Sequence, residues 1–174
     1  SIIGYLEEGG VPVATFNGQV IMGLRLPYAN LRTHRKILVV DGTVGFIGGM
    51  NIRAAFTGPD GARDTHFKVS GPVVADILAV AAEDWHFETG EGVLGPVWHV
   101  QLEGVVPGTG TAIRAVVSGP DSHIETNHKL LLGAFSVAEK SIRIVSPYFL
   151  PDTTFIAALN TAARRGVEVD VIVP

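Results

Sequence analysis

The sequence predicts an α/β fold in which a mixed sheet is flanked by helices. Short β-branched segments alternate along the chain with longer segments whose apolar residues recur at helical spacing, which is the pattern of strands interleaved with helices. The segment 167–173 is mostly β-branched, which predicts a central strand of a parallel sheet. The segment 91–111 is rich in Gly and Pro and predicts a linker between two series of elements.

Turn chemistry and helical periodicity define the elements before the linker. Asp41-Gly42 predicts a tight hairpin turn, and Gly71-Pro72 predicts a helix with Pro at its first position. The expected elements are, in chain order, a helix tail at 5–8, a strand at 11–16, a loop at 19–31, strands at 35–40 and 44–47, a loop at 51–65, a strand at 65–70 and a helix from 72 to about 87.

The elements after the linker follow from the same signals. Asp152 is a helix N-cap candidate and Gly166 marks the end of that helix. The expected elements are a strand at 112–118, a helix at 126–139, a strand at 141–146, the helix between Asp152 and Gly166, and the strand at 167–173.

A weak internal repeat relates the two halves. A helix end, a Gly cap and a Val-x-Val segment occur at Val11 and again at Val167, 156 residues apart. On this spacing residues 1–90 are the C-terminal part of one repeat and residues 112–174 the N-terminal part of the next, so the counterpart of His34 is expected at about residue 190. The alternative is that two unrelated helix-to-strand junctions look alike.

Composition excludes several classes of protein. With 174 residues, 47% hydrophobic side chains and no Cys, the chain is long and apolar enough for a core, and it has neither a disulfide framework nor a cysteine-based zinc site. No apolar stretch approaches the roughly 20 residues that span a bilayer, and the start, Ser-Ile-Ile-Gly, looks cut and carries no signal peptide. The net charge of −4 disfavours a general nucleic-acid binder.

The densest basic cluster lies at residues 32–36 and carries the candidate chemistry. On a strand, His34 and Lys36 project from one face and Arg35 from the other. Gly48-Gly49 lets backbone N–H groups approach an anion, and Asn51 can donate from its side chain. An imidazole nucleophile, a cation and neutral donors suit phosphoryl transfer without a metal or cofactor.

The complete spacing of this cluster is more specific than any of its parts. His34, Lys36, Asp41, Gly48-Gly49 and Asn51 match the His-x-Lys-x4-Asp-x6-Gly-Gly/Ser-x-Asn signature of the phospholipase D superfamily. Longer runs resemble the bacterial cardiolipin synthase branch over essentially the whole chain, with Ala62 where that family usually has Trp. These runs are Arg32–Gly42, Phe46–Ile52, Arg63–Pro72, Glu83–Trp85 and Ser146–Asp152.

The resemblance implies a phospholipase D-like fold and a two-step phosphatidyl transfer through a phosphohistidine. One His attacks the phosphodiester, while the His of a second motif protonates the leaving alcohol and then activates the acceptor. On the family pattern His34 takes one of these roles, Lys36, Asn51 and the glycines bind phosphate, and Asp41 orients the motif. No cofactor or metal is implied.

The resemblance also implies partners and a location. The substrates are phospholipids similar to phosphatidylglycerol and an alcohol acceptor, and the parent protein is expected at the cytoplasmic membrane of a bacterium, with this fragment itself soluble. The second motif is expected beyond residue 174, so we expect the isolated chain to have no transferase activity.

Other polar residues give weaker signals. Asp64 and His66 either face the site, with the carboxylate orienting an imidazole and both groups near substrate, or are polar residues at the start of a strand. His128-Lys129 is expected on a solvated helix flank, and Tyr148-Phe149 either lines a pocket or packs in the core. The remaining histidines lack metal-ligand spacing: His86, His99 and His123.

Two other functions remain open at this stage. A single-motif phosphodiesterase acting on nucleic acid would complete its site by homodimerisation, which the net charge and the early position of the motif disfavour. A non-enzymatic lipid-binding module is the other alternative, which an intact His34, Lys36 and Asn51 disfavour for the parent protein.

Overall fold

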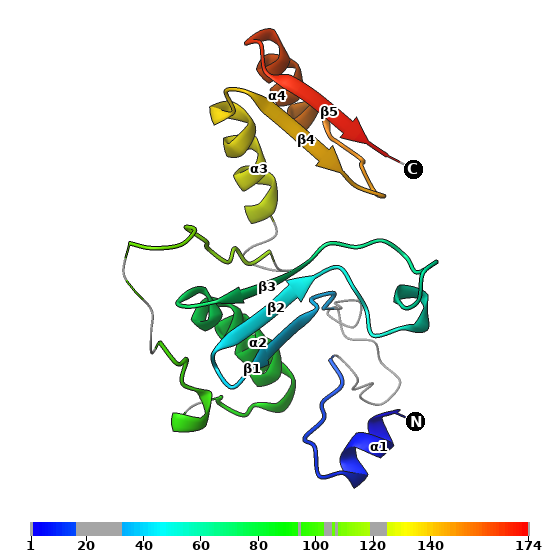
Figure 1. Cartoon of the computed structure of the whole chain (residues 1–174), viewed down its shortest axis with the longest axis vertical. Helices are drawn as coiled ribbons and strands as arrows, with labels where there is room; N and C mark the ends of the chain where they lie inside the picture. Colours follow the sequence, from blue (N-terminus) through cyan, green and yellow to red (C-terminus); the bar gives the residue numbers. More distant parts are fainter. Residues whose placement is uncertain are drawn as a thin grey trace. The chain divides into compact units, whose positions relative to one another are not determined.

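A computed structural model describes residues 2–16, 33–93, 95–102, 106, 108–118 and 125–173. The chain divides into two compact units, residues 1–115 (unit 1) and 116–174 (unit 2) (Figure 1). The division lies close to the end of the expected linker. The assignment of the two units to successive repeats of one domain stays a prediction.

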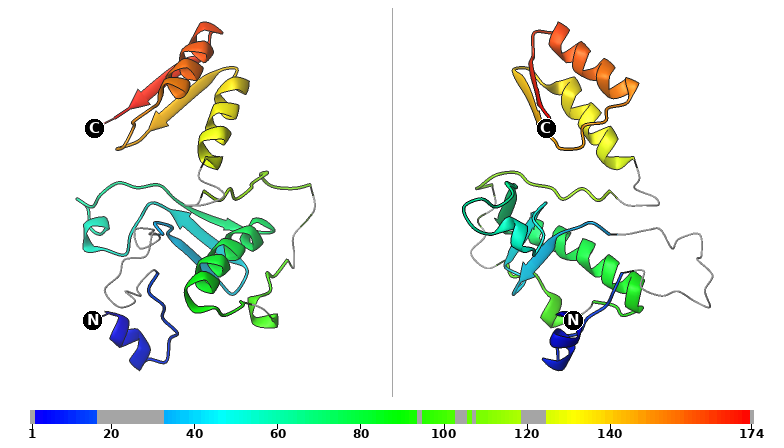
Figure 2. Two further views of the ribbon diagram at one scale, coloured as in Figure 1. Left: turned by 180° about the vertical axis from the view of Figure 1, so that it is seen from behind. Right: turned by 90° about the vertical axis from the view of Figure 1, so that its right-hand side faces the viewer.

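Unit 1 is built on a three-stranded antiparallel sheet with the order β1-β2-β3. The strands are β1 (Ile37–Val40), β2 (Val44–Gly48) and β3 (His66–Ser70). Helix α2 (Val73–Thr89) lies along one face of this sheet (Figure 2). A Cβ on Gly45 would approach the Ile77 side chain to 3.2 Å, so the glycine lets helix and sheet pack closely.

The hairpin between β1 and β2 turns as the sequence predicts. Asp41 and Gly42 both have positive φ, 52° and 62°, as a two-residue turn of the Asp-Gly type requires. Gln101 N–H donates to the Gly42 carbonyl at 2.9 Å, which ties the linker segment to the turn. Elsewhere unit 1 has helix α1 (Ile2–Glu8) and two single helical turns, Ala54–Phe56 and Pro96–Trp98.

Unit 2 pairs two parallel strands with two helices. These elements are α3 (Thr126–Val137), β4 (Ser141–Val145), α4 (Thr153–Arg164) and β5 (Glu168–Ile172). The buried core consists of Phe135, Ile142, Ala162 and Val167. Phe135 meets Phe155 edge to face, with ring centroids 4.8 Å apart, an arrangement that adds to simple burial.

Three strand predictions are wrong in whole or in part. Residues 11–16 and 112–118 form no strand, because within the described residues neither segment has a neighbouring strand to complete a hydrogen-bonded ladder. Strand β5 is parallel as predicted, but within the described residues its sole neighbour is β4, so it is not central. The loop expected at 19–31 lies outside the described residues.

The two helix ends that suggested a repeat have the same type of backbone cap. At the end of α1, Gly10 N–H donates to the Glu7 carbonyl and Val11 N–H to the Leu6 carbonyl, at 2.9 and 3.0 Å. At the end of α4, the same two bonds run from Gly166 to Ala163 and from Val167 to Ala162, at 3.0 and 3.2 Å. Both glycines have positive φ, as this Schellman cap requires.

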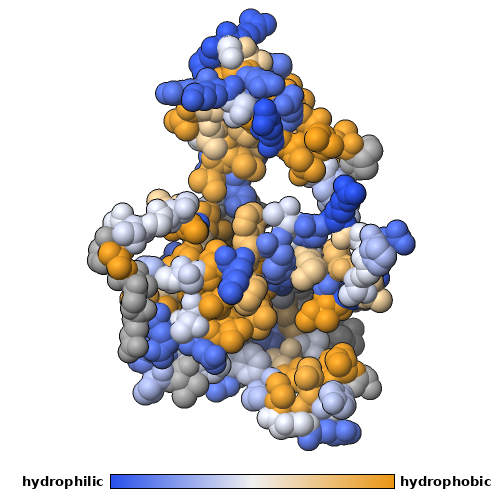
Figure 3. All heavy atoms as spheres, in the orientation of Figure 1, coloured by the Kyte–Doolittle hydropathy of each residue, from blue (hydrophilic) through white to orange (hydrophobic). Residues whose placement is uncertain are grey.

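Large apolar side chains reach the surface in both units (Figure 3). Leu38 is 56% exposed on the sheet face away from α2, and Tyr148 and Leu150, which follow β4, are 84% and 92% exposed. Within the described residues no helix has the length and apolar character needed to cross a membrane.

Candidate functional site

The candidate residues gather at one end of the sheet in unit 1. Strand β2 ends at Gly48, which lies directly opposite His66, the first residue of β3. Strand β1 begins at Ile37, opposite Ile47, so continuing the antiparallel register by one residue places Lys36 opposite Gly48. The His34-Arg35-Lys36 segment therefore directly precedes β1. The sequence had predicted that the strand begins at Arg35, two residues earlier.

Gly48 and Gly49 are glycines because the start of β3 and the two residues before it approach them too closely for a side chain. A Cβ on Gly48 would overlap the His66 imidazole and would lie 2.6 Å from the Thr65 carbonyl oxygen. A Cβ on Gly49 would lie 2.5 Å from an Asp64 carboxylate oxygen. The glycine pair thus marks a point of contact between two segments as well as the expected anion site.

Asp64 and His66 lie at this end of the sheet. The Gly49 N–H donates to Asp64 Oδ1 at 3.2 Å. His66 is half-buried, and its Nδ1 has no hydrogen-bond partner in the part of the chain that the structure describes. Both residues contact the glycine pair near the start of β3. They therefore lie beside the candidate site and also at the start of a strand, so the two interpretations of the sequence are compatible with each other.

Lys36 supplies a positive charge beside the glycines. Its ammonium group donates to the His34 carbonyl at 2.7 Å, and no carboxylate among the described residues forms an ion pair with it. His34 is exposed and Asn51 is half-buried. The arrangement offers an imidazole, an uncompensated ammonium group and a glycine backbone within one short stretch of surface.

Asp41 does not belong to this cluster in the structure. It occupies the hairpin turn at the far end of β1, and five extended residues place it roughly 17 Å from Lys36. Its carboxylate therefore does not reach an anion bound beside Lys36, and a role in orienting the motif would act through the hairpin.

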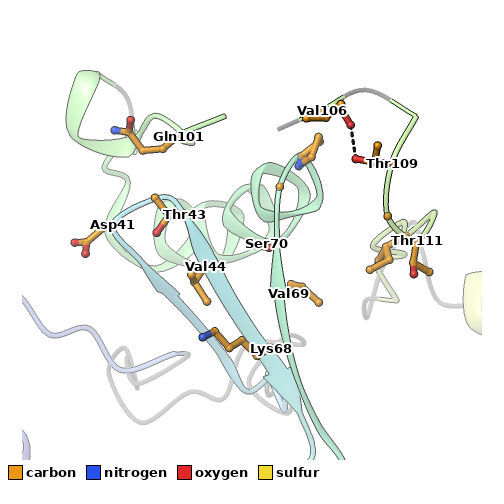
Figure 4. A pocket seen from close by; sticks show the side chains of 14 residues that line it. Asp41, Thr43, Val44, Lys68, Val69, Ser70, Gln101, Val106, Thr109 and Thr111 are labelled. Atoms are coloured by element: carbon orange, nitrogen blue, oxygen red, sulfur yellow. Dashed lines mark hydrogen bonds between the residues drawn. The ribbon is translucent and has the colours of Figure 1, made fainter. Parts of the chain in front are cut away.

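Asp41 instead borders an open depression of about 950 Å³ in unit 1. Figure 4 shows Asp41 and Lys68 at separate points on its rim, with Thr43 and Val44 of the hairpin between them. This hollow is thus at the opposite end of the sheet from His34, and the glycine pair does not line it.

Sequence reasoning missed a contact behind His34. Arg35 Nη1 pairs with Asp84 Oδ1 of α2, and Thr33 Oγ1 donates to Asp84 Oδ2 at 3.3 Å. The alternation of side chains did place Arg35 opposite His34 and Lys36, and the helical repeat places Asp84 two turns beyond Ile77 on the sheet side of α2. Those two signals together could have found the pair.

The weaker predictions fare differently in unit 2. On the expected solvated flank of α3, the Lys129 side chain is 73% exposed. The His128 side chain is 38% exposed, with its Nε2 3.0 Å from Asp152 Oδ2 and its ring 5.7 Å from that of Phe155. Phe149 also packs near Phe155, at 6.3 Å between ring centroids, whereas Tyr148 is exposed. The pKa of Asp152 is lowered, first by the hydrogen bond from the Phe155 N–H and also by His128.

Histidines outside the candidate site form no metal centre in the described residues. His86 Nδ1 lies 3.2 Å from the Glu91 carbonyl, and no group of three or more His, Asp or Glu side chains is placed to hold a metal ion within the described ranges. His123 lies outside those ranges.

The fold and the motif define a class, the phospholipase D-like α/β proteins, and comparison with known proteins narrows it. Residues 131–174 match the model of the cardiolipin synthase phospholipase D-like domain. The whole chain is 37% identical to a cardiolipin synthase of Alkalihalophilus pseudofirmus and 38% identical to one of Halalkalibacterium halodurans. A cardiolipin synthase A of Pseudomonas putida is 40% identical over 97% of the chain. The chain is thus a relative of the cardiolipin synthases over its whole length.

The chain spans about a third of the length of these relatives, 35% in each case. The family model matches within unit 2, whereas the relatives align with both units and so include the His34 motif. No solved structure matches the chain.

Proposed function

We propose that this chain supplies part of the active site of a longer phosphatidyltransferase, which moves a phosphatidyl group between phospholipids. The observation that carries the proposal is the meeting of His34, Lys36 and Gly48-Gly49 at one end of the sheet, with the lysine charge left unpaired among the described residues. The names of the relatives support the same chemistry.

The proposed reaction proceeds in two displacements at phosphorus. An imidazole nitrogen attacks the phosphodiester, a P–N bond forms, and the P–O bond to the leaving alcohol breaks as a second imidazolium gives that oxygen a proton. The acceptor hydroxyl then loses its proton to the second imidazole and attacks phosphorus, and the P–N bond breaks. His34 is one of the two imidazoles, and the other lies outside this chain.

Each neighbour of His34 has a proposed part in this chemistry. Lys36 neutralises the phosphoryl oxygens, and the Asn51 side chain and the Gly48-Gly49 backbone donate to them. Asp64, held by the Gly49 N–H, orients an imidazole, and His66 borders the substrate. Asp41 supports the motif from the hairpin turn without touching substrate.

The donor proposed is an anionic phospholipid similar to phosphatidylglycerol, and the acceptor is the hydroxyl of a second such molecule. The parent protein would then act at a membrane surface in a bacterium. A nuclease completed by homodimerisation finds no specific support here, because the net charge is −4 and no relative named above is a nuclease.

A transfer assay tests the proposal. The longer protein that contains this chain is purified as wild type, His34→Ala and His86→Ala, and is given labelled phosphatidylglycerol in detergent micelles. We expect His34→Ala to lose about 10²- to 10⁴-fold in cardiolipin formation, the usual contribution of a proton-transfer or nucleophilic group. His86→Ala, an exposed histidine on α2, should retain the wild-type rate. Transfer by His34→Ala at the wild-type rate would refute the proposal.

A further inference from the structure

The two residues that flank His34 in the sequence both bind one carboxylate. Asp84 uses its two oxygens separately, Oδ1 for the Arg35 guanidinium and Oδ2 for the Thr33 hydroxyl. His34 therefore lies between two anchors on a single side chain of α2. Because Arg35 bears the positive charge, its bond is charge-assisted and stronger than a neutral hydrogen bond.

The anchor itself rests on a firmly packed helix. Val73, Val74 and Ile77 of α2 are buried against the rest of unit 1, Val74 completely. Asp84 follows Ile77 by seven residues, so both lie on the same side of α2. The helix can thus fix a position in space for whatever Asp84 holds.

The segment that carries His34 needs such an anchor. Residues 33–36 precede β1, whose pairing with β2 begins at Ile37, so the ladder does not define the position of His34. Side chains alternate in direction along this segment. The Arg35 side chain bonds to Asp84 of α2, whereas the Lys36 ammonium group donates to the His34 carbonyl. Side-chain contacts on both faces of the segment thus determine the position of the His34 backbone, from which the imidazole projects.

We infer that Asp84 is a positioning residue, which holds His34 in place for phosphoryl transfer through Arg35 and Thr33. This inference rests on the proposed role of His34 and extends it to a residue that never touches substrate. A displacement of about 1 Å in a reacting group is enough to cost about 100-fold in rate.

We expect that the pair can be broken without unfolding the chain. The side chains of Arg35 and Asp84 are 24% and 25% exposed, and they border a hollow of about 240 Å³, so water can reach the guanidinium when the Asp84 carboxylate is removed. Asp84→Asn removes the charge while leaving an oxygen that can accept from Thr33. Glu83→Gln is the matched control, because Glu83 is an exposed neighbour on the same helix.

The first measurement is kinetic and uses the longer protein. We expect Asp84→Asn to lower kcat about 10- to 100-fold with KM changed less than about 2-fold, and Glu83→Gln to behave as wild type. In an Arg35→Met background the effect of Asp84→Asn should shrink to within about 2-fold, because the two residues act as a unit. Multiplicative effects of the two changes, or an unchanged kcat in Asp84→Asn, would overturn the inference.

The second measurement does not depend on transferase activity. In NMR spectra of the 174-residue chain, Asp84→Asn should shift the His34 imidazole and amide signals, whereas Glu83→Gln should leave them in place. Identical His34 signals in the two variants would overturn the inference even if His34 proves essential. Loss of the proposed function itself would appear separately, as an active His34→Ala.

Discussion

Gly48 offers the sharpest test of how the site is built, through the substitution Gly48→Ala. The methyl group would overlap the His66 ring and would lie 2.6 Å from the Thr65 carbonyl oxygen and 2.8 Å from the His66 Cα. Two of these three atoms belong to the backbone, so a change of rotamer cannot relieve the clash. Strand β3 must move away from β2 at the Gly48 and His66 pair.

The expected cost follows from the kind of atom that is hit. Overpacking a close contact typically costs 1–3 kcal/mol, and backbone atoms on both sides of the peptide place Gly48→Ala near the upper end, at about 3 kcal/mol. For a domain of this size that corresponds to a fall in Tm on the order of 10 °C. Gly48 has no positive φ, so the cost is steric and not conformational.

Two other glycines serve as comparisons in the same melting experiment. Gly49→Ser should cost less than Gly48→Ala, because its Cβ meets the Asp64 carboxylate, which can rotate away. Gly133→Ala lies inside α3 with no atom within 4 Å of the new methyl, so it should raise stability by about 0.5–1 kcal/mol. Thermal unfolding is followed by circular dichroism. A Gly48→Ala variant as stable as wild type would refute the close approach of β2 and β3.

The pH dependence and the core of unit 2 give two further predictions. The Asp152 carboxylate caps α4 through the Phe155 N–H, and its pKa is lowered. It therefore stabilises the fold at pH values above its ordinary pKa of 3.8, and this effect is lost as pH falls through the lowered pKa. Asp152→Asn should flatten the fall in Tm between about pH 5 and 2, and an unchanged pH profile would contradict the cap. Phe135→Ala, which empties the centre of the core, should cost about 3–5 kcal/mol by urea unfolding, whereas Leu150→Ala, at a side chain 92% exposed, should stay within about 0.5 kcal/mol; equal costs would show that the core is placed wrongly.

Features that depend on neighbouring residues were predictable from the sequence. Asp41-Gly42 forms the predicted turn because its positive φ angles favour that pair, and Asp152 caps α4 as expected. The apolar spacing of 73–87 identified α2 to within two residues at its end. Each of these depends on contacts within one or two turns of chain.

Features that depend on distant partners were not predictable. Residues 11–16 and 112–118 each contain three β-branched residues, yet in the described residues no strand lies beside them to form a ladder. For the same reason β5 was assigned to the centre of a sheet in which it has one described neighbour.

The candidate site divides in the same way. The spacing of His34, Lys36 and Gly48-Gly49 is local to one hairpin, and the hairpin brings them together. The contact between Arg35 and Asp84 joins residues 49 apart in the chain, and the pairing of Asp64 with Gly49 joins residues 15 apart. Asp41 is part of the motif in sequence, but β1 lies between it and Lys36, so the two residues are at opposite ends of that strand.

The central claim is that His34 takes part in forming a covalent phosphohistidine during phosphatidyl transfer. The most direct measurement is rapid quenching of the longer protein after it is mixed with phosphatidylglycerol labelled with ³²P, followed by counting of protein-bound label that is stable to alkali and labile to acid. We expect wild type and His86→Ala to accumulate this label within one turnover and His34→Ala to fail to do so. Label that accumulates in His34→Ala at the wild-type rate would contradict the account.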